Sequence, residues 1–216
     1  MSSYENFFTI ASCLFCASDV DFSPEMLYAA DMDVMEAIRR RRSIRRYKRE
    51  PIPDWVLREV LEAARLAPSW ANSQVCSYVV VRDEKIREAL SETLFERNPA
   101  RMAVKEAPCV VCLVAKRHVS GYYRGQPVTD KGDWFMYDSG IAMEHIVLAA
   151  WNFGLGTCHI GAFDAKKAEQ VLQIPEGYSI VAMTPIGYFE EMPEPRPRKS
   201  FPELVFLDVF GKSFPE

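Results

Sequence analysis

The stretch from Trp134 to Phe153 constrains this chain most, because it has the length of one long helix and is apolar on almost every side. About twenty residues at the α-helical rise span roughly 30 Å. The stretch contains Asp138, Glu144, His145 and Asn152, which argues for a buried helix over a membrane span. A chain of 216 residues has limited capacity to enclose such a helix. We therefore expect a subunit interface to help bury it, with Gly154 ending the helix in a left-handed conformation.

Helices and strands are expected to mix along the rest of the chain. Strands are predicted at residues 77–81, 108–115, 158–160 and 179–188, and helices from Asp33, from Asp54 to before Pro68, and over residues 85–97 and 164–172. Asp33, with Glu36 in a capping box, and Asp54 are the expected helix caps. Residues 118–131 are expected to form a loop. This order predicts an α+β fold, with one domain over residues 32–216 and an extension over residues 1–31.

The composition of the chain argues against several classes of protein. The formal net charge of −4 and the pI near 5.6 argue against a general nucleic-acid binder. The start of the chain lacks the basic residues of a secretory signal, and the six cysteines are scattered, as is typical of reduced thiols in a cytoplasmic protein. Cys109 and Cys112 have zinc-site spacing, but they lie in an expected strand, where residues three apart point to opposite faces. We therefore predict no metal site.

A dense basic segment, Arg39 to Arg49, holds seven arginines and one lysine. Such a cluster repels itself unless an anion or acidic side chains face it. In an extended segment, Arg41, Ser43, Arg45 and Tyr47 share one face because side chains alternate. Two guanidinium groups and a hydroxyl suit a phosphate monoester. The alternative interpretation is a solvated basic run or a nucleic-acid patch.

Five motifs follow one another in a set order. They are Arg41-Arg-Ser-x-Arg-x-Tyr47, Ala67-Pro-Ser-x-x-Asn-x-Gln74, Tyr137-Asp138 in the long helix that ends in Gly154-Leu-Gly-Thr157, Ile160-Gly-Ala-Phe163, and Pro195-Arg-Pro-Arg-Lys199. Together they make the chain, from about Asp33 to Val205, resemble the FMN-dependent nitroreductase family. The resemblance implies a central, mostly antiparallel sheet flanked by helices, and a homodimer with the long helix buried at its interface. FMN is the implied cofactor.

The resemblance also implies roles for particular residues. Arg41, Arg42 and Ser43 would hold the FMN phosphate, joined by Arg196 and Arg198 from the C-terminal arm. Arg45 would lie near the N1 and O2 edge of the flavin. The remaining cofactor contacts would come from a loop with Pro68, Ser69 and Asn72, partly from the other subunit, and from Gly161 and Ala162. The backbone N–H of Gly161 would donate to flavin N5, where a glycine permits close approach.

The implied activity is transfer of hydride from NAD(P)H, through flavin N5, to a nitroaromatic, a quinone or a similar small acceptor, with no catalytic side chain nominated. Two alternatives of the same fold stay open: a flavin-fragmenting lyase that forms a benzimidazole, and a dehalogenase. A non-catalytic protein that binds an anion or nucleic acid is an alternative from another class. Val75-Cys76 stands where many relatives have Pro-Trp, so one wall of the acceptor pocket departs from the family pattern.

Overall fold

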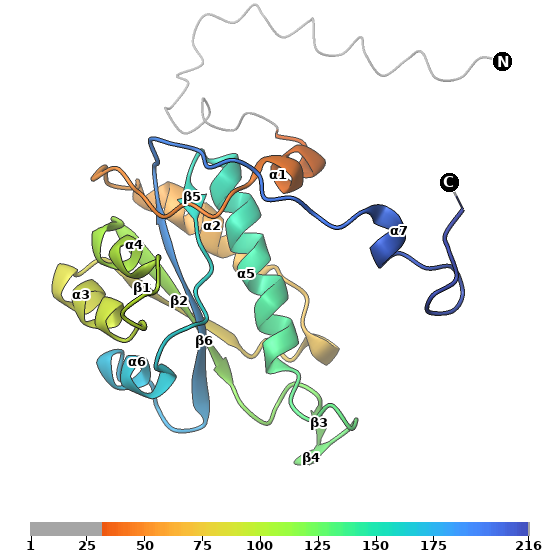
Figure 1. The fold of residues 1–216 in the computed structure, drawn as a ribbon. Coiled ribbons are helices and arrows are strands. Elements are labelled where there is room, and N and C mark those ends of the chain that lie inside the picture. The colour runs from red at the N-terminus through yellow and green to blue at the C-terminus, as the bar shows by residue number, and fades with distance from the viewer. Residues whose placement is uncertain (1–31, 216) are drawn as a thin grey trace, which may run out of the picture.

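The computed structural model describes residues 32–215 and forms three layers, with one antiparallel sheet between two layers of helices (Figure 1). The expected extension over residues 1–31 lies outside the described residues. Helices α2 and α5 cover one face of the sheet, and α3, α4 and α6 cover the other. The predicted α+β fold with an antiparallel sheet is confirmed.

The elements follow the chain in mixed order. The helices are α1 (Val34–Arg40), α2 (Asp54–Arg65), α3 (Glu84–Glu92), α4 (Arg101–Glu106), α5 (Phe135–Asn152), α6 (Ala165–Val171) and α7 (Phe201–Leu204), with a 3₁₀ turn η2 (Trp70–Asn72). The strands are β1 (Cys76–Val81), β2 (Cys109–Lys116), β3 (Tyr122–Tyr123), β4 (Gln126–Pro127), β5 (Gly156–Thr157) and β6 (Tyr178–Gly187). The main sheet has the order β1-β2-β6-β5, and β3 pairs only with β4.

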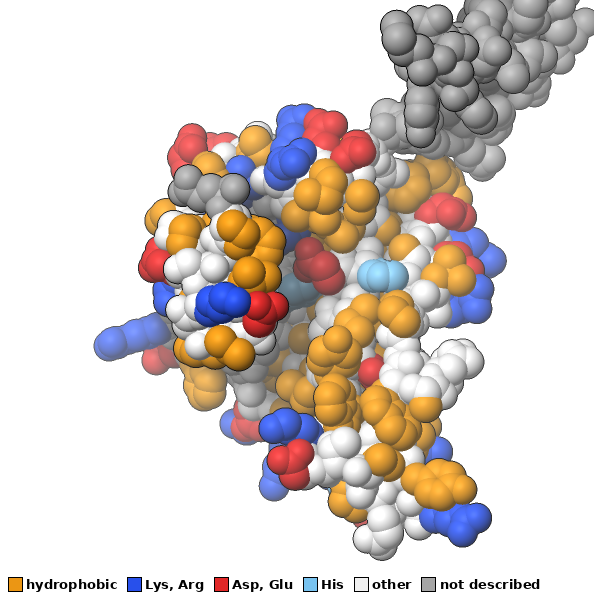
Figure 2. Space-filling view, turned by 90° about the vertical axis from the view of Figure 1, so that its right-hand side faces the viewer, with side chains coloured by type: hydrophobic (Ala, Val, Ile, Leu, Met, Phe, Trp, Pro, Cys, Tyr) orange, Lys and Arg blue, Asp and Glu red, His pale blue; other side chains and the backbone are white. Residues whose placement is uncertain are grey.

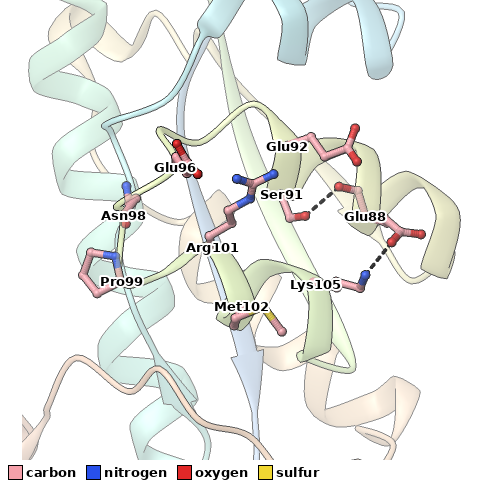
Figure 3. Close-up of a pocket in the computed structure, with 9 residues that line it drawn as sticks. All are labelled: Glu88, Ser91, Glu92, Glu96, Asn98, Pro99, Arg101, Met102 and Lys105. Carbon is pink, nitrogen blue, oxygen red and sulfur yellow. Dashed lines mark hydrogen bonds and ion pairs between the residues drawn. The ribbon is translucent and has the colours of Figure 1, made fainter.

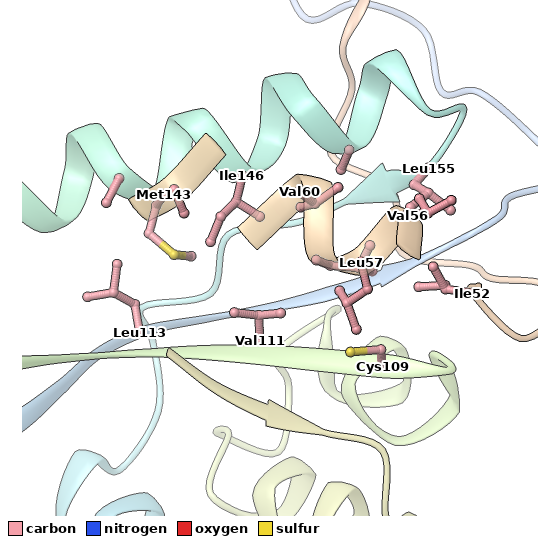
Figure 4. Packing of buried hydrophobic residues seen from close by; sticks show 14 of the residues in the cluster. Ile52, Val56, Leu57, Val60, Cys109, Val111, Leu113, Met143, Ile146 and Leu155 are labelled. Atoms are coloured by element: carbon pink, nitrogen blue, oxygen red, sulfur yellow. The ribbon is translucent and has the colours of Figure 1, made fainter. Parts of the chain in front are cut away.

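Strand β2 is buried on both faces, as its apolar sequence predicts. Alternate side chains reach opposite core clusters because the strand has a side-chain period of two. Val111 and Leu113 face α2 and α5, where Ile146 lies fully buried (Figure 4). Val110 and Val114 face the layer formed by α3, α4 and α6. The strand therefore joins two hydrophobic cores through one sheet.

Cys109 and Cys112 belong to these opposite clusters, as the spacing predicts. Both thiols are buried, and burial raises the pKa of Cys109 to about 11 and of Cys112 to about 12. The thiolate is the reactive form, and a raised pKa leaves little of it near neutral pH.

We expect Cys109 and Cys112 of the native protein to resist iodoacetamide at pH 8, and to react once the chain is unfolded in guanidinium chloride. Peptide mass mapping of alkylated samples measures the modification of each cysteine separately. Alkylation of either residue in the native protein at the rate seen in the unfolded chain would contradict the buried, protonated state.

Three local expectations were wrong. Residues 85–97 do not form one helix: α3 ends at Glu92, Leu94 pairs with Phe163, and α4 follows after a turn. Residues 158–160 are not the strand, because β5 lies at Gly156–Thr157 and Ile160 makes only an isolated bridge to β6. The expected loop over residues 118–131 contains the β3–β4 hairpin.

The helix caps agree in part with expectation. Asp33 accepts hydrogen bonds from the N–H groups of Met35 and Glu36, which confirms the cap of α1. The Glu36 carboxylate pairs with Arg40 at 2.7 Å. The expected cap at Asp54 was wrong, because Pro53 takes that position and the Asp54 carboxylate lies 2.6 Å from Arg82 Nη1. The carboxylates of Glu36 and Asp54 are thus each paired with an arginine.

Helix α5 is buried on one side only. Ala142, Ile146 and Ala150 pack into the core, whereas Met136 and Tyr137 are exposed. Hydrophobic side chains gather in a band on the side of the molecule that Figure 2 shows. The single chain therefore encloses this helix only in part, as expected for a chain of this size, because one sheet and α2 cover only part of its circumference. In the described part of the chain, no helix is long and apolar enough to cross a membrane.

Candidate functional site

The two arginine-rich segments of the chain line one cavity of about 820 Å³. One wall comes from the end of α1 and the extended residues after it, and the other comes from residues 193–198. The lining includes six arginines and one carboxylate: Arg39, Arg41, Arg42, Arg45, Arg196, Arg198 and Glu194. Segments about 150 positions apart in the sequence thus converge within a single chain, and the cavity is strongly cationic.

Local structure explains why the first segment presents its polar side chains. Helix α1 ends at Arg40, Arg41 leaves the helix with a ψ of 143°, and Ser43 pairs with Thr157 of β5 in a parallel bridge. The N–H of Ile44 donates to the Thr157 carbonyl at 2.8 Å, and the Ile44 side chain is buried. Alternation then turns Ser43 and Arg45 toward the cavity. Gly156 permits this approach, because a Cβ there would lie 2.5 Å from Ile44 Cγ1.

The arginines of the cavity are held in different ways. Arg42 Nη1 donates to the carbonyls of Arg39, Arg40 and Arg41 and so caps the end of α1. Its Nε is buried without a hydrogen-bond partner. Arg41 Nε lies 3.2 Å from Glu144 on α5. Among residues 32–215, no ion pair engages the other arginines of the lining. The cavity therefore has donors to spare for an anion.

Tyr47, the last member of the first motif, holds the segment in place. Its hydroxyl lies 2.7 Å from the Ile44 carbonyl and 3.0 Å from that of Pro185. Burial raises its pKa well above the ordinary value for tyrosine. The hydroxyl therefore stays protonated and serves as a donor to backbone carbonyls of the fold.

The expected flavin-contacting loop lies elsewhere in the single chain. Pro68 and Ser69 line a separate cavity of about 120 Å³, together with Cys76 and Asp138, whereas the Asn72 side chain is exposed. Asp138 is buried on α5 and accepts from Trp70 N–H at 2.9 Å, Ser73 Oγ at 3.2 Å and Ser120 Oγ at 2.7 Å.

The backbone of this loop is unusual. Ala71, Asn72 and Gln74 have φ values of 45°, 54° and 49°, in the left-handed region that favours glycine. Two hydrogen bonds hold the loop in this conformation, one donated by the Trp70 N–H to buried Asp138 and one by the Gln74 N–H to Ser69 Oγ at 2.9 Å. Strain of this kind persists where the surrounding structure over-determines it, and it occurs often at functional sites.

Gly161 and Ala162 are exposed and follow Ile160, which is anchored to Met183 of β6. Asn98 Nδ2 donates to the Ala162 carbonyl at 3.1 Å, and Asn98 Oδ1 accepts from the Ala100 N–H at 2.9 Å. A Cβ placed on Gly161 would meet no atom within 4 Å. Hydrogen bonds thus hold this segment on one side, and the other side, at Gly161, is open.

Sequence reasoning missed a contact network centred on Glu144. Its carboxylate lies between Arg41 and His159, and His159 Nε2 is 3.8 Å from Glu144 Oε2. His159 Nδ1 lies 3.1 Å from Oγ1 of fully buried Thr184. His159 and then Arg41 lower the pKa of Glu144, against the opposing effect of partial burial. The signal in the sequence was a second carboxylate, after Asp138, in the middle of an apolar helix.

Another cavity, of about 490 Å³, lies between α3 and α4 (Figure 3). An ion pair joins Glu88 to Lys105 across part of its wall, and Glu92, Glu96 and Arg101 also line it. This cavity holds none of the predicted cofactor residues. Within residues 32–215, no group of three or more His, Cys, Asp or Glu side chains is placed to hold a metal ion.

Comparison with known proteins decides the family. The model of the Nitroreductase family matches residues 38–188. The chain belongs to the nitroreductase family. It is 30% identical over 199 residues to an NADH dehydrogenase from Thermus thermophilus, covering 81% of this chain and 95% of that protein.

Solved structures of the nitroreductase family agree with this assignment. The chain is 33% identical to a nitroreductase family protein from Clostridium novyi NT, with a TM-score of 0.65 over 85% of this chain and 97% of that one. It is 26% identical to an FMN-dependent nitroreductase from Clostridium difficile R20291, with a TM-score of 0.68 over 82% and 99% of the two chains.

Proposed function

We propose that this chain is a cytoplasmic FMN-dependent oxidoreductase that uses NAD(P)H to reduce a nitroaromatic, a quinone or a similar small acceptor. The observation that carries the proposal is the convergence of Arg41, Ser43 and Arg45 with Arg196 and Arg198 on one cationic cavity. Membership of the nitroreductase family supports it, as do relatives named for NADH and for FMN.

The donors of the cavity fit the phosphate of FMN. Guanidinium groups bind phosphate through paired, charge-assisted hydrogen bonds, and five arginines of the lining have no acidic partner among the described residues. Arg41 offers its two Nη groups because its closest approach to Glu144 is at Nε. Arg42 contributes positive charge, but its Nη1 is already committed to the carbonyls of α1. We therefore assign the direct contacts to Arg41, Ser43, Arg196 and Arg198.

The remaining cofactor residues act on the ring system. When bound, FMN would carry the hydride from the nicotinamide to the acceptor. The Arg45 guanidinium would place positive charge beside the N1 edge of the flavin and so favour its anionic reduced form. The Gly161 N–H, held from behind through Ile160 and Asn98, would offer a fixed donor. No side chain is needed as an acid or base in this scheme.

We include a homodimer in the proposal. Pro68, Ser69 and Asn72 do not line the arginine cavity of their own chain. A two-fold interface along the exposed side of α5 would bury Met136 and Tyr137 and would let this loop reach the cofactor of the partner subunit. The backbone of the loop is strained and is held in place before the partner subunit binds. Such preorganisation suits a contact across the interface.

The visible spectrum tests the proposal. We expect purified protein to be yellow, to lose its flavin absorbance when NADH or NADPH is added without air, and to regain it when a nitroaromatic is added. Protein that binds FMN but is reduced by neither nicotinamide would contradict an oxidoreductase. Loss of intact flavin over many turnovers in oxygen would favour the lyase, and a colourless protein that binds oligonucleotides in a salt-sensitive way would favour the binding protein.

A further inference from the structure

Glu144 is placed where it touches two parts of the proposed cofactor site at once. It lies on α5, and its side chain is less than half exposed. One carboxylate oxygen is 3.2 Å from Arg41 Nε, and the other is 3.8 Å from His159 Nε2. Arg41 lines the cationic cavity, and His159 is two residues before Gly161. One side chain thus links the segment expected to hold phosphate to the segment expected to face the flavin ring.

The atoms that make these contacts determine which nitrogens of Arg41 stay free to bind an anion. The Glu144 carboxylate approaches Arg41 most closely at Nε, at 3.2 Å. An arginine held at Nε keeps both Nη groups for a second anion, and its planar fork loses less freedom on binding because it is already oriented. On the other side, His159 is held by Thr184, which is fully buried on β6. Glu144 therefore lies between Arg41 and a histidine that is hydrogen-bonded to the sheet.

We propose that Glu144 is a positioning residue that orients the Arg41 fork toward the FMN phosphate. The inference rests on the proposed function, because it takes the FMN phosphate as the anion that Arg41 receives. Glu144 does not touch the phosphate, and it acts on affinity only through Arg41. Its effect should therefore appear in the affinity for FMN and be absent from the affinity for riboflavin, which lacks the phosphate.

The test is titration of the flavin-free protein with FMN and with riboflavin, followed by flavin fluorescence. We expect Glu144→Ala to lower the ratio of FMN affinity to riboflavin affinity by about tenfold, the scale of one misplaced charge-assisted contact. Glu144→Gln keeps the size of the side chain, and we expect a smaller fall in the same direction. It serves as the second variant if Glu144→Ala does not fold.

Two matched variants separate positioning from general effects. Glu62→Ala removes a carboxylate that pairs with surface Arg65 and does not line the cavity, so it should leave the ratio unchanged. In an Arg41→Ala background, Glu144→Ala should produce no further fall, because the residue through which it acts is gone. A purely structural role for Glu144 would lower both affinities together and leave their ratio intact.

The titrations distinguish failure of this inference from failure of the proposed function. A ratio that is unchanged in both Glu144 variants, or that falls equally with and without Arg41, would overturn the inference while leaving the proposed function in place. A ratio that rises would show that Glu144 competes with phosphate for Arg41, which also overturns it. Wild-type protein that binds neither flavin would overturn the proposed function itself.

Discussion

Replacing Arg41 and Arg198 together by alanine should remove most of the preference of this protein for FMN over riboflavin. The two residues come from opposite walls of the same cavity, one after α1 and the other on the C-terminal arm. A hydrogen bond to a charged group contributes roughly 1.5–3 kcal/mol. Loss of two such contacts should lower FMN affinity by at least about 100-fold. Riboflavin affinity should change little, since riboflavin lacks the phosphate.

The measurement is again the pair of titrations with FMN and riboflavin, and the matched control is Arg65→Ala. Arg65 also pairs with a carboxylate, but it lies on α2 outside the cavity. A double variant that keeps its full preference for FMN would show that the phosphate binds elsewhere. Loss of preference in the Arg65 variant as well would indicate a general effect of charge.

Replacing Asp138 by alanine should produce a large loss of stability. The carboxylate is 1% exposed and accepts hydrogen bonds from Trp70, Ser73 and Ser120. Its removal leaves buried donors without partners, and it releases a loop whose left-handed residues hold their conformation only under constraint. We expect the free energy of unfolding to fall by about 3 kcal/mol, which lowers the Tm by roughly 6–12 °C in a chain of this size.

Thermal unfolding followed by circular dichroism measures this effect. Asp130→Ala is the control, because Asp130 lies shortly before the same helix, its side chain is 87% exposed, and its nearest cation, Lys131, is 3.9 Å away. The control should unfold within about 2 °C of the wild type. An equal fall in both variants, or none in either, would show that the contacts of Asp138 do not stabilise the loop.

The arginines and Asp138 differ in how far the sequence alone indicates their roles. Arg41 could be named from the sequence, because a self-repelling cluster in a chain that is acidic overall needs an anion. Arg198 was named only through the resemblance to the nitroreductase family. Asp138 could be placed in a motif but not given its partners. Those partners lie 65 and 68 positions away for Ser73 and Trp70, and no local periodicity encodes such a contact. The same reason explains why Glu144 and His159 were missed.

Two errors concerned the ends of predicted helices. The apolar spacing after Lys85 continues past the end of α3, but Leu94 pairs with Phe163 and draws the chain out of the helix. Asp54 has the chemistry of a cap and is instead engaged by Arg82, which follows β1 in the sequence. The end of α3 thus reflects a contact distant in sequence that outweighs a weak local preference, whereas Asp54 lies one position past the cap, inside the helix.

Side-chain alternation, helical spacing and local charge in the amino-acid sequence were enough to predict the core strand covered on both faces, the long apolar helix, the left-handed Gly154 and the basic segment after α1. The antiparallel pairing and the C-terminal arginines were expected only through the family resemblance. The three-dimensional fold was needed to show two other contacts between distant groups, those of Asp138 with the loop after α2 and those of Glu144 with Arg41 and His159. The physical reason is that hydrogen bonds and ion pairs act over a few ångströms, so they are set by how the sheet and helices pack.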